Sequence, residues 1–159
     1  MQLSLPIRAA CCIPLLCIAL CSRGERWQHY GGDAGGRHYS TASQINRDNV
    51  DDLEVAWVHR SGDVERYGDE MNNTSTQSTP ILLPPEAGES LVYCTPFNEV
   101  IALDPANGET RWSFDPGIDR RGDRPFRCRG VSYARIAASA PGAACEHRLF
   151  LGTHDRHLW

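Results

Sequence analysis

The sequence has no lysine. Its 16 positive charges are all arginine, set against 20 acidic residues, and the formal net charge is −4. Neither sign is gathered into a block, so no basic surface for a nucleic acid is expected. The share of hydrophobic residues (41%) and of charged residues (23%) is typical of a folded globular domain, and the 159 residues are enough for one such domain.

A long hydrophobic run is also missing. The longest apolar stretch, Ala9 to Cys21, is too short for a membrane-spanning helix, which needs roughly 20 residues. Its position after a single N-terminal arginine favours an export signal over residues 1–21. A lipid attachment at Cys21 is a further interpretation, because Ile-Ala-Leu-Cys resembles a bacterial lipoprotein processing site, although Leu20 is larger than the residue usual there.

Cysteine is scarce after the signal, where only Cys94, Cys128 and Cys145 remain. An exported protein meets an oxidising compartment, in which nearby thiols tend to pair. Cys128 and Cys145 flank a loop rich in glycine, alanine, serine and proline, and we predict a disulfide between them. The alternative is three unrelated buried thiols. Cys94 lies within an apolar strand pattern and is predicted to be a small core residue.

No segment has a persuasive helical period, but the sequence does contain a repeat. Residues 91–101 align with residues 149–159, and each copy runs from an apolar start through a threonine and a polar turn to a second apolar start. This pattern predicts a β-hairpin. The two copies start 58 residues apart. Short strands that repeat with a period of about 40 to 60 residues are typical of propeller blades, which must stack on one another to bury their faces. The predicted fold class is all-β.

Seven strands are expected, at 54–60, 79–83, 90–95, 99–103, 110–114, 129–137 and 148–153. Residues 62–77 and 115–127 are expected to be long loops. Between two of the strands, residues 104–108 have the proline and glycine of a tight turn. Trp57 and Trp112 are predicted to pack between adjacent sheets.

Several short motifs, taken in their order along the chain, resemble the quinoprotein dehydrogenases, which use pyrroloquinoline quinone (PQQ). They include Trp-Gln-His-Tyr-Gly-Gly-Asp at 27–33, Cys-Arg-Gly-Val-Ser-Tyr at 128–133 and Gly-Thr-His-Asp at 152–155. The resemblance implies a periplasmic, eight-bladed β-propeller. Residues 22–159 would be its N-terminal part, a lead-in segment and about one and a half blades. The chain is therefore expected to be a truncated piece, with the catalytic aspartate and the Ca²⁺ ligands beyond Trp159 and no metal ligand within it.

The motif Cys-Arg-Gly-Val-Ser-Tyr, with its single cysteine, resembles the corresponding motif of the glucose dehydrogenase branch. The alcohol dehydrogenase branches carry two adjacent cysteines before this point. The resemblance thus implies a sugar or polyol substrate, with electrons passed to a quinone or a cytochrome. A quinoprotein alcohol dehydrogenase is one alternative. A non-catalytic propeller lipoprotein that serves as a scaffold is another, although a scaffold needs neither this motif nor the lead-in at 27–33.

The resemblance also implies cofactor-binding residues. PQQ carries three carboxylates, which favour guanidinium and hydroxyl partners. Arg129 matches the family's cofactor-binding arginine, and its alternative role is a pairing with a surface acid. Thr153 is either a cofactor contact or a consensus threonine of the repeat, equivalent to Thr95. Gln77 stands where much of the family has a glutamate, so it can form hydrogen bonds but cannot accept a proton. Cys128 aligns beside the cofactor edge.

Overall fold

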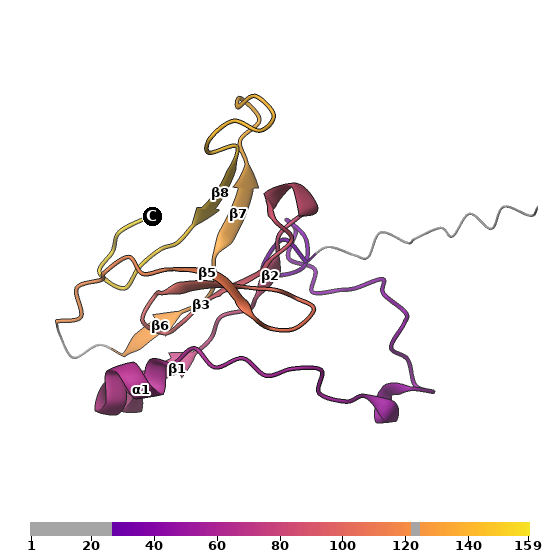
Figure 1. Ribbon diagram of the computed structural model, residues 1–159, viewed down its shortest axis with the longest axis horizontal. Coiled ribbons are helices and arrows are strands. Elements are labelled where there is room, and N and C mark those ends of the chain that lie inside the picture. Colours follow the sequence, from indigo (N-terminus) through magenta and orange to yellow (C-terminus); the bar gives the residue numbers. More distant parts are fainter. Residues whose placement is uncertain (1–26, 122–124) are drawn as a thin grey trace, which may run out of the picture.

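The computed structural model describes residues 27–121 and 125–159, and short strands dominate it (Figure 1). The predicted signal at 1–21, with Cys21, lies outside the described residues. The strands are β1 (Thr74–Thr76), β2 (Ile81–Leu82), β3 (Leu91–Cys94), β4 (Val100–Leu103), β5 (Thr110–Phe114), β6 (Phe126–Cys128), β7 (Ser132–Arg135) and β8 (His147–Phe150). The helices are α1 (Asp63–Tyr67) and the 3₁₀ turns η1 (Val50–Asp52), η2 (Gly68–Asn73) and η3 (Pro85–Ala87). None of these helices has the length and apolar character needed to cross a membrane.

The central element is a four-stranded antiparallel sheet in the order β2-β3-β4-β5. Leu91 pairs with Leu103, and Cys94 pairs with Val100. Strand β3 alternates between buried and half-buried residues, whereas all four residues of β4 are buried. A strand buried on both faces has a layer on each side of it. The core consists of Ile81, Leu83, Val92, Cys94, Val100, Ala102, Cys128, Val131 and Leu151.

The sequence repeat corresponds to a structural repeat. In residues 95–99 and in residues 153–157, the first amide N–H donates to the fifth carbonyl oxygen, over 2.8 Å and 2.9 Å. The fourth amide donates to the first carbonyl oxygen, over 2.9 Å and 3.0 Å. The fourth residue, Asn98 or Arg156, has a left-handed φ of 67° or 70°. The two hairpin turns predicted from the alignment therefore have the same hydrogen bonding and the same backbone conformation.

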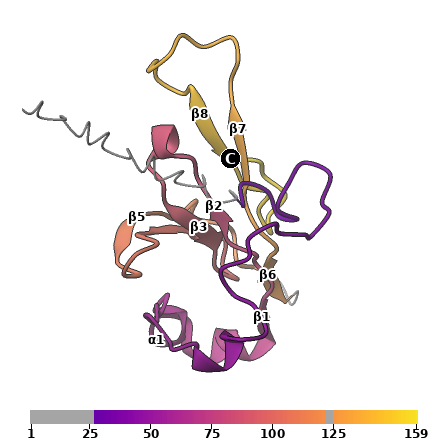
Figure 2. The ribbon, with the colours of Figure 1, turned by 90° about the vertical axis from the view of Figure 1, so that its right-hand side faces the viewer.

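The second copy of the hairpin belongs to a second sheet. Strands β7 and β8 pair in antiparallel fashion. The chain then turns back, and Leu151 and Trp159 exchange two backbone hydrogen bonds of 3.1 and 3.0 Å. Figures 1 and 2 show the β7–β8 hairpin projecting from one side of the central sheet, with α1 on the other side. The described residues thus contain one four-stranded sheet and two two-stranded sheets, β1–β6 and β7–β8.

Other sequence-based expectations are wrong. Residues 54–60 form no strand, because no described strand pairs with them, and Val55 and Val58 are 80% and 72% exposed. The segment 62–77, expected to be a loop, contains α1, η2 and β1. Strands β1 and β6, which were not predicted, pair in parallel.

The two tryptophans differ in their surroundings. Trp57 covers the turn at 104–108 and does not lie between two sheets: its indole N–H donates to the Pro105 carbonyl oxygen over 3.2 Å. A Cβ at Gly108 would lie 2.4 Å from the Trp57 ring, and Gly108 has a φ of 74°, so only glycine fits this turn. Trp112, by contrast, lines an apolar hollow between β4–β5 and the second sheet, as predicted, together with Val100, Phe114, Leu149, Leu151 and Trp159.

The loop of the β7–β8 hairpin is held by a carboxylate, and it should loosen in acid. Glu146 accepts hydrogen bonds from the Gly142 N–H (2.6 Å) and the Arg135 guanidinium (2.8 Å). These bonds, the one from Gly142 first, lower the pKa of Glu146 below its ordinary value of 4.5. Because folding depresses this pKa, the stabilisation is complete above pH 4.5 and is lost as the pH falls through the lower folded-state pKa.

We expect hydrogen exchange of residues 136–146, corrected for the intrinsic pH dependence of exchange, to accelerate in the intact protein over that acid range. Glu146→Gln should already show the faster exchange at neutral pH and change little on acidification. Glu109→Gln, at an exposed turn, serves as the control. If acid accelerated hydrogen exchange of residues 136–146 equally in the unaltered protein and in Glu146→Gln, the Glu146 carboxylate would not be what holds the loop.

Candidate cofactor site

A hollow of about 600 Å³ lies beside the start of β7. Its lining comes from segments far apart in the sequence, namely Tyr30, Gln77 and the run Arg129, Gly130, Val131 and Ser132. The volume lies within the range of small-molecule sites, about 300–1,000 Å³. The structure therefore places Gln77 and Arg129, two of the four residues that the sequence predicts to bind a cofactor, at one cavity.

Arg129 supplies the positive charge of this hollow. Its side chain is exposed, and it forms no hydrogen bond or ion pair with any residue in the described part of the chain. The alternative interpretation, a pairing with a surface acid, thus finds no acid among these residues. A guanidinium that the protein leaves unpaired can form two parallel hydrogen bonds with a carboxylate.

The remaining polar lining consists mainly of hydrogen-bonding groups. The Gln77 side-chain N–H donates to the Ser75 hydroxyl over 3.0 Å, and Tyr30 and Ser132 add a phenol and a hydroxyl. None of the six lining residues is acidic. A hollow with one cation, several polar groups and no negative charge is chemically suited to an anionic ligand.

Tyr30 was not among the residues predicted for the site, although it lies within the lead-in motif at 27–33. The Trp27 indole N–H donates to the Tyr30 carbonyl oxygen over 3.3 Å. The Gly32 N–H closes the same turn by donating to the His29 carbonyl oxygen over 2.9 Å. The sequence could have indicated Tyr30 through the glycines of this motif, because they predict a tight turn, and a tight turn exposes the side chain at its tip.

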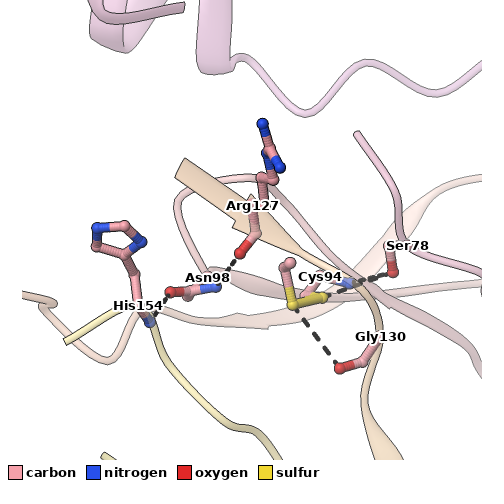
Figure 3. The surroundings of a disulfide bond; sticks show 7 residues. Ser78, Cys94, Asn98, Arg127, Gly130 and His154 are labelled. Carbon is pink, nitrogen blue, oxygen red and sulfur yellow. Dashed lines mark hydrogen bonds between the residues drawn. A yellow bond between two sulfur atoms is a disulfide. The ribbon is translucent and has the colours of Figure 1, made fainter. Parts of the chain in front are cut away.

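Cys128 is bonded to Cys94 and not to Cys145, so the predicted pairing is wrong (Figure 3). Strand β3 ends at Cys94, and β6 passes close enough for the two Cα atoms to lie 6.0 Å apart. Cys145 lies in the loop that projects beyond β7 and β8, where it is exposed and free. Cys94 is buried, as predicted, but it is a disulfide partner.

Thr153 does not line the hollow. It is buried in the turn at 153–157, where its hydroxyl donates to the Asp155 carboxylate over 2.5 Å and accepts from the His157 N–H over 3.2 Å. The Thr153 hydroxyl thereby lowers the pKa of Asp155 below its ordinary value. Thr95 begins the equivalent turn of the first copy. The geometry therefore favours the interpretation of Thr153 as a residue of the repeat.

The described residues contain no group of three or more histidine, cysteine, aspartate or glutamate side chains that could hold a metal ion. The resemblance implies Ca²⁺, for which the described residues offer no such group of carboxylates. No metal ligand is therefore assigned among residues 27–121 and 125–159.

Comparison with known proteins extends this description. Residues 27–159 match the PQQ family model described as the glucose/ethanol/alcohol dehydrogenase β-propeller domain. Quinoprotein glucose dehydrogenase A of Acinetobacter calcoaceticus is 41% identical over 146 residues, which cover 83% of this chain and 17% of the relative. Quinate/shikimate dehydrogenase (quinone) of Acinetobacter baylyi is 31% identical over 161 residues, which cover 92% and 19%. The chain thus spans less than a fifth of the length of these relatives.

A solved structure of a quinohemoprotein alcohol dehydrogenase from Pseudomonas putida HK5 is similar with a TM-score of 0.59. It is 22% identical, and the match covers 82% of this chain and 16% of that one. At this identity the similarity concerns the fold alone.

Proposed function

The chain belongs to the PQQ-dependent glucose, ethanol and alcohol dehydrogenase family, and we propose that it forms part of the cofactor site of an enzyme that oxidises a sugar or another polyol. The observation that carries the proposal is the meeting of Gln77 and Arg129 at one hollow whose described lining residues include no acid. The β2–β5 sheet would be one blade of an eight-bladed ring, and β7–β8 would begin the next. Neighbouring blades would cover the faces that this chain leaves exposed.

In this proposal Arg129 binds a carboxylate of PQQ through its guanidinium. Gln77, Tyr30 and Ser132 would add hydrogen bonds that orient the cofactor in the hollow. When bound, PQQ supplies a quinone that accepts two electrons from a C–OH group. No catalytic base is assigned within the chain, because Gln77 cannot accept a proton. The base and the Ca²⁺ ligands are proposed to come from other parts of the protein.

The proposed substrate class rests on two observations. The motif around Cys128 lacks the second, adjacent cysteine of the alcohol dehydrogenase branches, and the two relatives above are named for glucose and for quinate or shikimate. All three named compounds carry several hydroxyl groups on a ring. A quinone or a cytochrome is the proposed electron acceptor, and the periplasm, reached through the signal at 1–21, is the proposed location.

The test uses the full-length protein, purified without cofactor and then supplied with PQQ and Ca²⁺. We expect bound quinone absorbance, and reduction of an artificial electron-accepting dye that is faster with glucose, quinate or glycerol than with ethanol at equal concentration. Failure to bind PQQ would overturn the cofactor role. Binding of PQQ followed by oxidation of ethanol alone would overturn the substrate class.

A further inference from the structure

The Cys94–Cys128 disulfide lies beside Gly130, the residue that follows Arg129 (Figure 3). Cys128 precedes Arg129, and its sulfur lies 3.7 Å from the carbonyl oxygen of Gly130, which follows Arg129. The disulfide therefore contacts the chain on both sides of the arginine. Gly130 has a φ of 149°, a conformation that L side chains rarely adopt, so glycine is favoured at this point.

The other half of the disulfide lies beside Gln77. The Cys94 N–H donates to the hydroxyl of Ser78, the next residue after Gln77, over 3.2 Å, and the Cys94 sulfur lies 3.5 Å from the same oxygen. The disulfide and the hydrogen bond from Cys94 to Ser78 together connect the neighbour of Gln77 with the neighbours of Arg129. These are the two residues predicted from the sequence that line the hollow.

Strand β6 is held further by the turn that follows β3. The carbonyl oxygen of Arg127 accepts a hydrogen bond from the Asn98 side chain over 3.4 Å. The ring of Phe126 packs against that of Phe97, with 5.0 Å between the ring centroids. Consecutive residues of β6 are therefore fixed to the segment 94–98, whereas the next residue, Arg129, has an exposed side chain.

We propose that the Cys94–Cys128 disulfide is a positioning element that sets the affinity for PQQ by acting through Arg129. This inference rests on the proposed function. A long arginine side chain has many rotamers, and fixing its backbone reduces the freedom that is lost when a ligand binds. Opening the disulfide would let the segment that carries Arg129 move relative to Ser78 and Gln77, so the two walls of the hollow would no longer be held together.

The test is a double-mutant cycle in the full-length protein, with the dissociation constant for PQQ measured by equilibrium titration well below the unfolding temperature of every variant. Cys94→Ala with Cys128→Ala should weaken PQQ binding by about 10-fold. In a protein that already carries Arg129→Ala, the same two cysteine substitutions should change the dissociation constant for PQQ by less than about twofold. The disulfide is proposed to act through Arg129, and that side chain is then absent. Cys145→Ala, at the exposed free thiol, is the matched control and should bind PQQ like the unaltered protein.

Each result has a definite meaning. Equal losses with and without Arg129, or no loss at all, would overturn the positioning role. If the unaltered protein fails to bind PQQ, the proposed function fails, and the inference fails with it. If the double cysteine variant does not fold, the same cycle is run on folded protein whose disulfide has been reduced in place, with and without Arg129→Ala.

Discussion

Replacing Arg129 with alanine in the full-length protein should weaken PQQ binding by about 10- to 100-fold and leave thermal stability nearly unchanged. A hydrogen bond to a charged group contributes roughly 1.5–3 kcal/mol, and each 1.4 kcal/mol is a factor of ten in the dissociation constant. The guanidinium has no partner among the described residues, so its removal breaks no contact of the folded chain there. Surface changes of this kind typically alter stability by less than about 0.5 kcal/mol. The measurements are PQQ titration and thermal unfolding without cofactor.

Two further variants separate a local contact from a general charge effect. Arg127→Ala removes the same charge from an exposed side chain in β6, while the backbone carbonyl that Asn98 contacts is kept. It should weaken PQQ binding by less than about threefold, because only long-range attraction is lost. Arg129→Lys keeps the charge but loses the planar guanidinium that can form two parallel hydrogen bonds. Its affinity for PQQ should lie between that of the unaltered protein and that of Arg129→Ala. Equal losses for Arg127→Ala and Arg129→Ala would refute a specific contact.

The sequence predicted the parts of the fold that have a local signal. The strands of the central sheet have apolar residues bounded by turn residues, and the hairpin turns recur with the same polar pattern. Strand β1 (Thr74–Thr76) has no apolar alternation, and its partner β6 lies far along the chain. Such short parallel pairing is stabilised by tertiary packing, which local patterns do not encode. The same reasoning explains why residues 54–60 look like a strand and are not one: they contain a short run of apolar residues between polar ones, but no described strand pairs with them.

The candidate site was predicted by resemblance and completed by geometry. Gln77 and Arg129 were identified singly, and only the folded chain shows that they line one hollow with Tyr30. The cysteine pairing was wrong because closeness in sequence was taken as closeness in space. Two cysteines can bond only if their Cα atoms approach within about 7 Å, and the contacts of β6 with the turn after β3 bring Cys128 to Cys94.

Asn98 is the residue whose replacement should most weaken this part of the structure. Its side chain is fully buried. The side-chain oxygen accepts a hydrogen bond from the His154 backbone N–H over 2.8 Å, and the side-chain NH₂ group donates one to the Arg127 backbone carbonyl oxygen. It therefore joins the turns of both repeats to β6. Asn98→Ala leaves a buried donor and acceptor unpaired, at roughly 1–3 kcal/mol, and puts a Cβ-bearing residue without a capping side chain at a φ of 67°, at roughly 1–2 kcal/mol.

We expect Asn98→Ala to lower the free energy of local opening by about 2–5 kcal/mol. Hydrogen exchange of residues 94–98 and 152–157 in the full-length protein measures this quantity. Asn98→Gly accommodates the left-handed backbone, so it isolates the lost hydrogen bonds and should be milder by about 1 kcal/mol. Arg156→Ala, at the equivalent position of the second repeat, replaces one Cβ-bearing residue by another at a left-handed φ and removes only an exposed side chain, so it should cost less than about 0.5 kcal/mol. If Asn98→Ala were no worse than Arg156→Ala, the buried amide would not be what joins the two repeats, and the firm attachment of β6 ahead of Arg129 would depend on the disulfide, on aromatic packing and on the pairing with β1.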